Sequence, residues 1–231
     1  MRRAPIAVVV VVACAGALAG GACGPDLPER MWRSEHVRYF SRAGDDSVCP
    51  AILDQLEEHG QVIADALGIQ RSIVSYYKFD GAADFHAHSV CDDVADGCAQ
   101  NSTAYTPNGF ERHELIHAYL APYGVPPALL REGAAVALSC DRFPRPTGSW
   151  RDAYAADRLS PGREVYGAGG WLVGYLLRMF RATWLVNLYG KVASNATADE
   201  FARAFLERYG FELDNVWAAA ISSPQMPMRC P

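Results

Sequence analysis

The residues of this chain that are best suited to chemistry are His113, Glu114 and His117, which form the pattern HExxH. On a helix, residues four apart lie on one face with Cβ atoms roughly 5–6 Å apart, so the two imidazoles can share one metal ion. Glu114, one step after His113, can reach a water molecule on that ion rather than the ion itself. The pattern therefore predicts a metal centre built for hydrolysis.

A third ligand is predicted at Glu132, which is followed by Gly133-Ala134-Ala135. Catalytic zinc sites use three protein ligands and leave a fourth position for water. The small residues after Glu132 predict a slim helix that can approach the helix of the HExxH pattern closely. The alternative, two core histidines on a helix, would leave Glu114 and Glu132 partly buried without evident charge partners, which is costly. We therefore expect a zinc site.

The elements around these residues predict an α+β fold, with a small mixed sheet and a mainly helical C-terminal half. Period-two alternation and β-formers predict strands at 36–42, 72–79 and 103–106, the last as an edge strand. Helical spacing and its capping signals predict helices at 49–67, 81–90, 127–139, 166–180, 182–192, 198–209 and 212–221. The HExxH helix is expected to begin after an N-cap at Asn108, paired with Glu111, and to close at Tyr123-Gly124.

The amino-terminal segment predicts export. A basic Met1-Arg2-Arg3 precedes an apolar run from Ile6 to Leu18 and four small residues, the order found in bacterial signal peptides. The run is too short for a membrane anchor, which needs about 20 apolar residues. We expect a signal peptide at 1–22, a tether at 23–33 and one domain at 34–231. Cys23 is the preferred lipidated residue, with Cys14 and simple secretion as alternatives, so the protein is expected in the periplasm or at the cell surface.

The charge of the chain bears on its binding partners, and its cysteines bear on the disulfides that it can form. The net charge is −5 and no basic stripe is present, which excludes nucleic acid as an expected partner. Cysteines outside the cytoplasm tend to pair. Cys91 and Cys98 bracket a short acidic turn and are the expected disulfide, and Cys49–Cys140 is the second pairing that we predict. The sequence does not define an oligomeric state.

The residues from Glu111 to Trp217 resemble a single-domain gluzincin, a peptidase MA-like zinc metallopeptidase. The resemblance is carried by three stretches: His113-Glu114-Leu115-Ile116-His117, then Pro127-Ala128-Leu129-Leu130-Arg131-Glu132-Gly133-Ala134-Ala135, and Tyr166-Gly167-Ala168-Gly169-Gly170-Trp171-Leu172-Val173-Gly174-Tyr175-Leu176. A metzincin would need glycine and histidine where this chain has Leu120 and Tyr123. A thermolysin-type enzyme would carry an acidic residue where this chain has Val136.

The resemblance implies a function and a role for each site residue. His113, His117 and Glu132 would bind Zn²⁺, Glu114 would be the general base, and Tyr166 would stabilise the oxyanion. The substrate would be a peptide or protein outside the cytoplasm. Two rivals stay open: a lipoprotein that binds zinc without turnover, and a zinc amidase that acts on cell-wall peptides.

Overall fold

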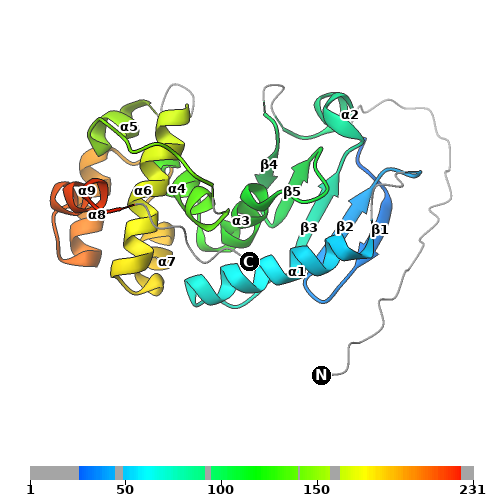
Figure 1. The fold of residues 1–231 in the computed structure, drawn as a ribbon, viewed down its shortest axis with the longest axis horizontal. Helices are drawn as coiled ribbons and strands as arrows, with labels where there is room; N and C mark the ends of the chain where they lie inside the picture. The colour runs from blue at the N-terminus through cyan, green and yellow to red at the C-terminus, as the bar shows by residue number, and fades with distance from the viewer. Residues whose placement is uncertain (1–25, 45–48, 92–94, 140, 157–161, 225–231) are drawn as a thin grey trace. The chain divides into compact units, whose positions relative to one another are not determined.

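The computed structural model describes residues 26–44, 49–91, 95–139, 141–156 and 162–224. Within these ranges it shows an α+β fold with one mixed five-stranded sheet and a mainly helical C-terminal half, as predicted (Figure 1). The expected signal peptide at 1–22, the two lipidation candidates Cys14 and Cys23, and Cys140 lie outside the described residues.

The described chain divides into two compact units. The first contains the residues up to Gln61 together with Arg71–Tyr119, and it holds the sheet. The second contains Val62–Gln70 and the residues from Leu120 onward, and it is helical. A short segment, Val62–Gln70, thus belongs to a different unit from the residues on either side of it.

The sheet has the strand order β1-β2-β3-β5-β4 (Figure 1). Its strands are β1 (Arg30–Arg33), β2 (Val37–Ser41), β3 (Val74–Lys78), β4 (Cys98–Gln100) and β5 (Thr103–Thr106). Strands β2, β3 and β5 run parallel, while β1 and β4 add antiparallel edges. Strand β5 is therefore interior rather than an edge strand, and the last four residues of the expected tether form β1. Both differences arise because short β1 and β4 become strands only through their pairing with a neighbouring strand.

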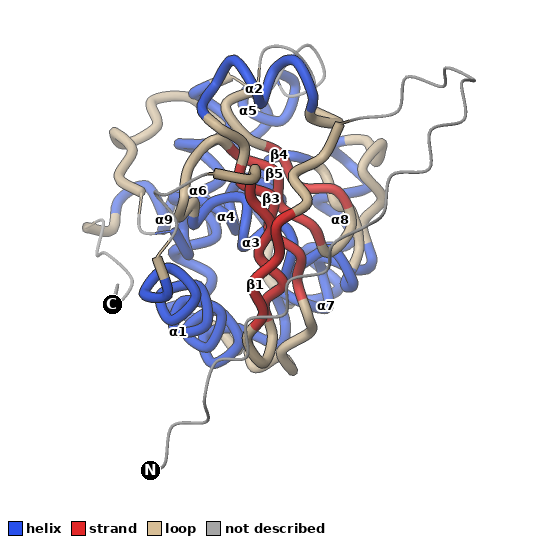
Figure 2. The backbone as a smooth tube through the Cα atoms, turned by 90° about the vertical axis from the view of Figure 1, so that its right-hand side faces the viewer, coloured by secondary structure: helices blue, strands red, loops and turns tan. Residues whose placement is uncertain are grey.

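The two faces of the sheet differ in burial. One face carries Val37, Tyr39, Val74, Tyr76 and Ala104, all with 0% exposure, and it packs into the core of this unit. Helix α1 (Pro50–Leu67) covers this face, since the side chain of Ile52 and the hydroxyl of Tyr39 both approach Gly109. In Figure 2 this helix lies to one side of the strands. Alternating burial along β2, β3 and β5 is the pattern of a sheet with a single covered face.

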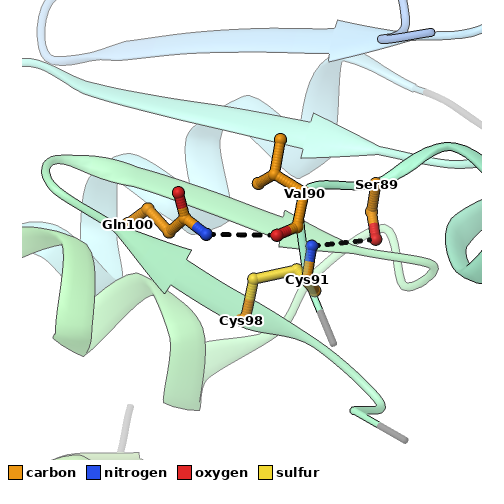
Figure 3. The surroundings of a disulfide bond; sticks show 5 residues. All are labelled: Ser89, Val90, Cys91, Cys98 and Gln100. Carbon is orange, nitrogen blue, oxygen red and sulfur yellow. Dashed lines mark hydrogen bonds between the residues drawn. A yellow bond between two sulfur atoms is a disulfide. The ribbon is translucent and has the colours of Figure 1, made fainter. Parts of the chain in front are cut away.

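A disulfide joins Cys91 to Cys98, as predicted, and ties the segment after helix α2 (Gly81–His88) to strand β4 (Figure 3). Two hydrogen bonds flank it: Gln100 Nε2 donates to Val90 O at 3.2 Å, and Cys91 N donates to Ser89 Oγ at 3.3 Å. The predicted Cys49–Cys140 pairing is wrong, because Cys49 is a free, exposed thiol. Nothing in the chain near Cys49 had distinguished a paired thiol from a free one.

Most of the helices of the described chain follow the first unit in sequence. They are η1 (Ala121–Tyr123), α4 (Ala128–Ser139), α5 (Trp150–Ala156), α6 (Arg163–Met179), α7 (Ala182–Lys191), α8 (Ala198–Tyr209) and α9 (Leu213–Ser222). Helix α8 shows a capping box in which Thr197 Oγ1 accepts from Glu200 N and the Glu200 carboxylate accepts from Thr197 N. Helix α5 falls in the C-terminal half that was predicted to be mainly helical, but its seven residues are too few for a clear period to predict its bounds. In the described ranges no helix is long and apolar enough to cross a membrane.

Candidate metal centre

Helix α3 (Arg112–Leu120) carries the HExxH residues and is fixed at its N-terminal end by the sheet. The Tyr76 hydroxyl accepts from Glu111 N at 2.7 Å and donates to Asn108 O at 3.0 Å. Glu111 Oε1 accepts from His113 N at 3.3 Å, so Glu111 caps the helix. The predicted N-cap, Asn108, is displaced from that role and donates instead to the Glu111 carboxylate. A buried strand residue thus sets where the helix begins.

The C-terminal part of α3 packs on α1 through Tyr119, which is 1% exposed. A Cβ at Gly60 would lie 2.3 Å from the Tyr119 hydroxyl, so the absence of a side chain at Gly60 allows this contact. Arg71 approaches the same hydroxyl at 3.4 Å and forms an ion pair with Glu57 on α1. Helix α3 is therefore held at both ends within the first unit, with the two histidines between the anchors.

The two histidines of α3 bring the same ring nitrogen, Nε2, close together. His113 Nε2 and His117 Nε2 lie 3.1 Å apart, and the ring planes are inclined by 78°. Two imidazole nitrogens that each bind one zinc ion at about 2.0–2.1 Å in a tetrahedral site lie about 3.3 Å apart. Both rings are half-buried. The histidine pair has the geometry of a chelate.

Glu114 lies close to Gly97, the residue directly before strand β4. A Cβ at Gly97 would lie 3.0 Å from Glu114 Cγ and 3.6 Å from its carboxyl carbon. Gly97 therefore leaves the space in which the Glu114 side chain runs. Gly97 was not predicted as part of the site, and its position directly before Cys98 gave no local signal.

Helix α4 carries Glu132 and packs closely on α6. A Cβ at Gly133 would lie 2.5 Å from both the carbonyl carbon and the oxygen of Gly169, and one at Gly169 would lie 2.3 Å from Leu129 O. We predicted that Gly133 would allow α4 to approach the HExxH helix. That interpretation of Gly133 is wrong, since the backbone it contacts belongs to α6. The glycines therefore fix α4 against α6.

The Glu132 carboxylate is buried, with 5% exposure of the residue. Arg131 Nε donates to Glu132 Oε1 at 2.9 Å. Tyr189 on α7 is 3% exposed and lies close enough to Glu132 for the carboxylate to influence its pKa. Burial raises the pKa of Tyr189, Arg131 lowers it and the carboxylate raises it further, so this phenol stays neutral. Tyr189 is a second residue near the site that was not predicted from the sequence.

Three ligand atoms come together from the predicted residues. One atom each from His113, His117 and Glu132 lie within 4.8 Å of one another, so this group could hold a metal ion. The donor set, two imidazoles and one carboxylate, matches that of catalytic zinc sites with an open fourth position.

Other predicted or alternative site residues are placed as follows. The ring of Tyr166 on α6 stacks with Phe143 at 6.3 Å. Its role as oxyanion donor stays a prediction. His86 and His88 lie on helix α2, where His88 Nδ1 contacts the Asp84 carboxylate at 2.8 Å. These two histidines do not join the metal group.

A separate cavity of about 780 Å³ lies in the second unit. The segment from Asp141 to Ser149 forms much of its wall. The rest comes from two residues of α5 and three of α6: Asp152, Ala153, Glu164, Gly167 and Ala168. None of the three ligand residues lines it, so this cavity and the metal group are different features of the molecule.

Comparison with known proteins adds no family to this picture. No protein-family model matches the chain, and no curated protein has a significantly similar sequence.

Proposed function

We propose that this protein is a zinc-dependent metallopeptidase of gluzincin type that cleaves peptide bonds outside the cytoplasm. The observation that carries the proposal is the convergence of His113, His117 and Glu132 on one ligand-sized volume, with Glu114 on the same helix as the histidines. The Glu132 carboxylate is buried and already pairs with Arg131 through Oε1. A divalent cation bound by the two imidazoles would add a second positive charge beside this carboxylate.

The residues present fit zinc better than a hard cation. Two imidazoles suit Zn²⁺, whereas Ca²⁺ and Mg²⁺ prefer oxygen ligands. The 3.1 Å between the two Nε2 atoms agrees with two ligands of a tetrahedral ion. When bound, zinc would supply Lewis acidity, which lowers the pKa of a coordinated water and polarises a carbonyl group.

The chain itself supplies the proton transfers. The Glu114 carboxylate takes a proton from the attacking water and returns it to the leaving nitrogen of the scissile bond. Its side chain runs past Gly97, where the absence of a Cβ leaves room for it. His113 and His117 orient as a pair because α3 is anchored at both ends. Glu132 is held by the packing of α4 on α6.

The test compares Glu114→Gln with the wild-type chain. The variant removes the proton-accepting carboxylate but no metal ligand, so we expect full zinc content and a loss of peptide cleavage of at least about 100-fold. Zinc is measured by elemental analysis of the purified protein, and cleavage with a broad quenched-fluorescence peptide library. Glu58→Gln is the matched control, because Glu58 is an exposed glutamate on α1 and its replacement changes the charge equally.

The same assays separate the rival functions. A zinc-loaded wild-type chain that cleaves neither peptides nor cell-wall fragments would be a binding protein, and the peptidase proposal would fail. Cleavage of wall fragments without cleavage of the peptide library would assign an amidase. Comparable peptide turnover by Glu114→Gln and wild type would remove Glu114 as the base.

A further inference from the structure

The face of the sheet that α1 does not cover has an unusual composition. Its strand residues include two basic side chains, Arg33 and Arg38, and no acidic one, although the whole chain carries a net charge of −5. Lys78 is 7% exposed and faces the core, whereas Arg33 and Arg38 are exposed on the opposite face. The nearest acids in sequence, Glu29 and Glu35, stand in the segments flanking β1. We call this opposite surface the open face.

The strand registers order the open face into two rows. The apolar row crosses all five strands through Met31, Phe40, Tyr77, Tyr105 and Cys98. The rings of Phe40 and Tyr77 stack at 4.3 Å, and those of Tyr77 and Tyr105 at 5.3 Å. Each residue of this row is half-buried, and none is fully covered by described residues. Its three central residues, Phe40, Tyr77 and Tyr105, thus form a stacked aromatic strip with partial exposure.

The second row, the polar row, lies beside the first and contains Arg33, Arg38, Ser75, Thr103 and Gln100. Arg33 and Arg38 are direct cross-strand partners on one face. Like charges directly opposite in an antiparallel pair are destabilising. Neither arginine has an ion-pair partner among the described residues. An anionic group seated between the two guanidinium groups would relieve their repulsion.

We propose that the open face docks on the surface of an anionic lipid bilayer. Tyrosine and phenylalanine rings favour the boundary between headgroups and acyl chains, and arginine binds lipid phosphates through paired N–H donors. An apolar row beside the arginine pair of the polar row matches that boundary. A second copy of the chain is a poorer occupant, because a two-fold contact would bring two arginine pairs together.

The position of the open face along the chain agrees with this partner. Strand β1 begins at Arg30, seven residues after Cys23, the residue predicted to carry lipid. Seven residues span at most about 25 Å when fully extended. A chain anchored at Cys23 therefore keeps β1 close to the bilayer. This argument from distance rests on the predicted lipidation of Cys23. The arguments from the arginine pair and from the two rows of the open face do not depend on it.

The experiment is flotation of the full chain with limiting amounts of vesicles of three parts phosphatidylcholine and one part phosphatidylglycerol, against phosphatidylcholine alone. We expect Arg33→Ala with Arg38→Ala to weaken binding to the anionic vesicles on the order of 30-fold at low salt. Arg33→Lys with Arg38→Lys keeps the charge and most of the binding. Lys191→Ala with Arg203→Ala is the matched control, since it removes two exposed charges from the helical unit and leaves binding unchanged.

Hydroxyl-radical footprinting of vesicle-bound protein reports on the open face itself. Membrane binding through the amino-terminal segment, which all variants have in common, would not by itself produce this signal. We expect peptides containing Phe40, Tyr77 and Tyr105 to be protected on anionic vesicles only, and only when both arginines are present. Equal reactivity of these residues in bound and free protein would overturn the proposal. So would a concentration-dependent dimer that protects the same peptides without lipid, because it would assign the open face to a second copy.

Discussion

Helices α3 and α4 supply the ligands of the candidate metal centre in different ways. On α3, one helical turn places His113 and His117 together, and local hydrogen bonds at the helix start and the Tyr119 contact hold the turn in place. On α4, a single buried carboxylate depends on the packing of two helices that touch backbone to backbone. The comparison teaches that the site has a local half, the histidine pair on α3, which one helical turn creates. It also has a tertiary half, Glu132 on α4, which depends on packing between helices that are distant in sequence.

The largest effect is expected where the tertiary half is disturbed. Gly169→Val would place its Cβ 2.3 Å from Leu129 O and 2.8 Å from Gly133 Cα, and backbone atoms cannot move aside. We expect the free energy of unfolding to fall by about 3 kcal/mol or more, with loss of zinc binding. Urea unfolding and elemental analysis measure both.

Gly174→Val is the control for this variant, because it lies on the same helix and a Cβ at this position would meet nothing within 4 Å among the described residues. Its free energy of unfolding should stay within about 1 kcal/mol of wild type. If both glycine variants were equally stable, the close contact between α4 and α6 would not hold Glu132.

A smaller effect is expected on the local half, and it should appear in turnover rather than in stability. Gly97→Ala brings a methyl group to 3.0 Å from Glu114 Cγ, so the flexible glutamate must shift. A misplacement of about 1 Å can cost about 100-fold in rate. We expect kcat/KM for peptide cleavage to fall by roughly 10- to 100-fold, with zinc content unchanged. Unchanged kcat/KM would show that Gly97 does not steer the base.

The smallest effect concerns the support of α3 by His59, a residue of α1 that is 1% exposed and packs on Phe110. Burial, with help from Arg112, lowers the pKa of His59 to about 4 from an ordinary value of 6.5. Below pH 6.5 the unfolded chain takes up a proton that the folded chain refuses until about pH 4. The contribution of His59 to stability is therefore complete above pH 6.5 and is lost as the pH falls toward 4.

His59→Leu tests this dependence. We expect the wild-type free energy of unfolding to drop by roughly 2 kcal/mol from this residue between about pH 7 and about pH 5, and the variant to lack that part of the drop. Urea unfolding at the two pH values measures the difference. Identical pH slopes for the two proteins would show that His59 does not couple to folding in this range.

The local half of the site could be predicted from the sequence, and the tertiary half only in part. The spacing of His113 and His117 implies their proximity on any helix, and Pro127 with Gly124 marks the break before α4. The sequence also predicted Glu132 as the third ligand, from its residue type and the small residues after it. It could not identify the neighbours of Glu132, since the contact between Gly133 and Gly169 joins residues 36 positions apart.

The sheet shows the same limit. Its central strands β2 and β3 have enough β-branched and aromatic residues to be recognised, and both were predicted. Strands β1 and β4 have four and three residues, and their side chains are polar or mixed. They become strands only because a longer strand lies beside each of them, so β5 was mistaken for an edge. Cross-strand order depends on distant pairing that no local pattern records.

The most direct test of the central claim is a zinc-binding titration of the purified chain, with Glu132→Gln measured beside it. We predict one zinc ion per wild-type chain and an affinity at least about 100-fold lower for the variant, since loss of a ligand should cost more than loss of a residue that supports one. Equal affinities, or a wild-type chain that binds no zinc, would contradict the account.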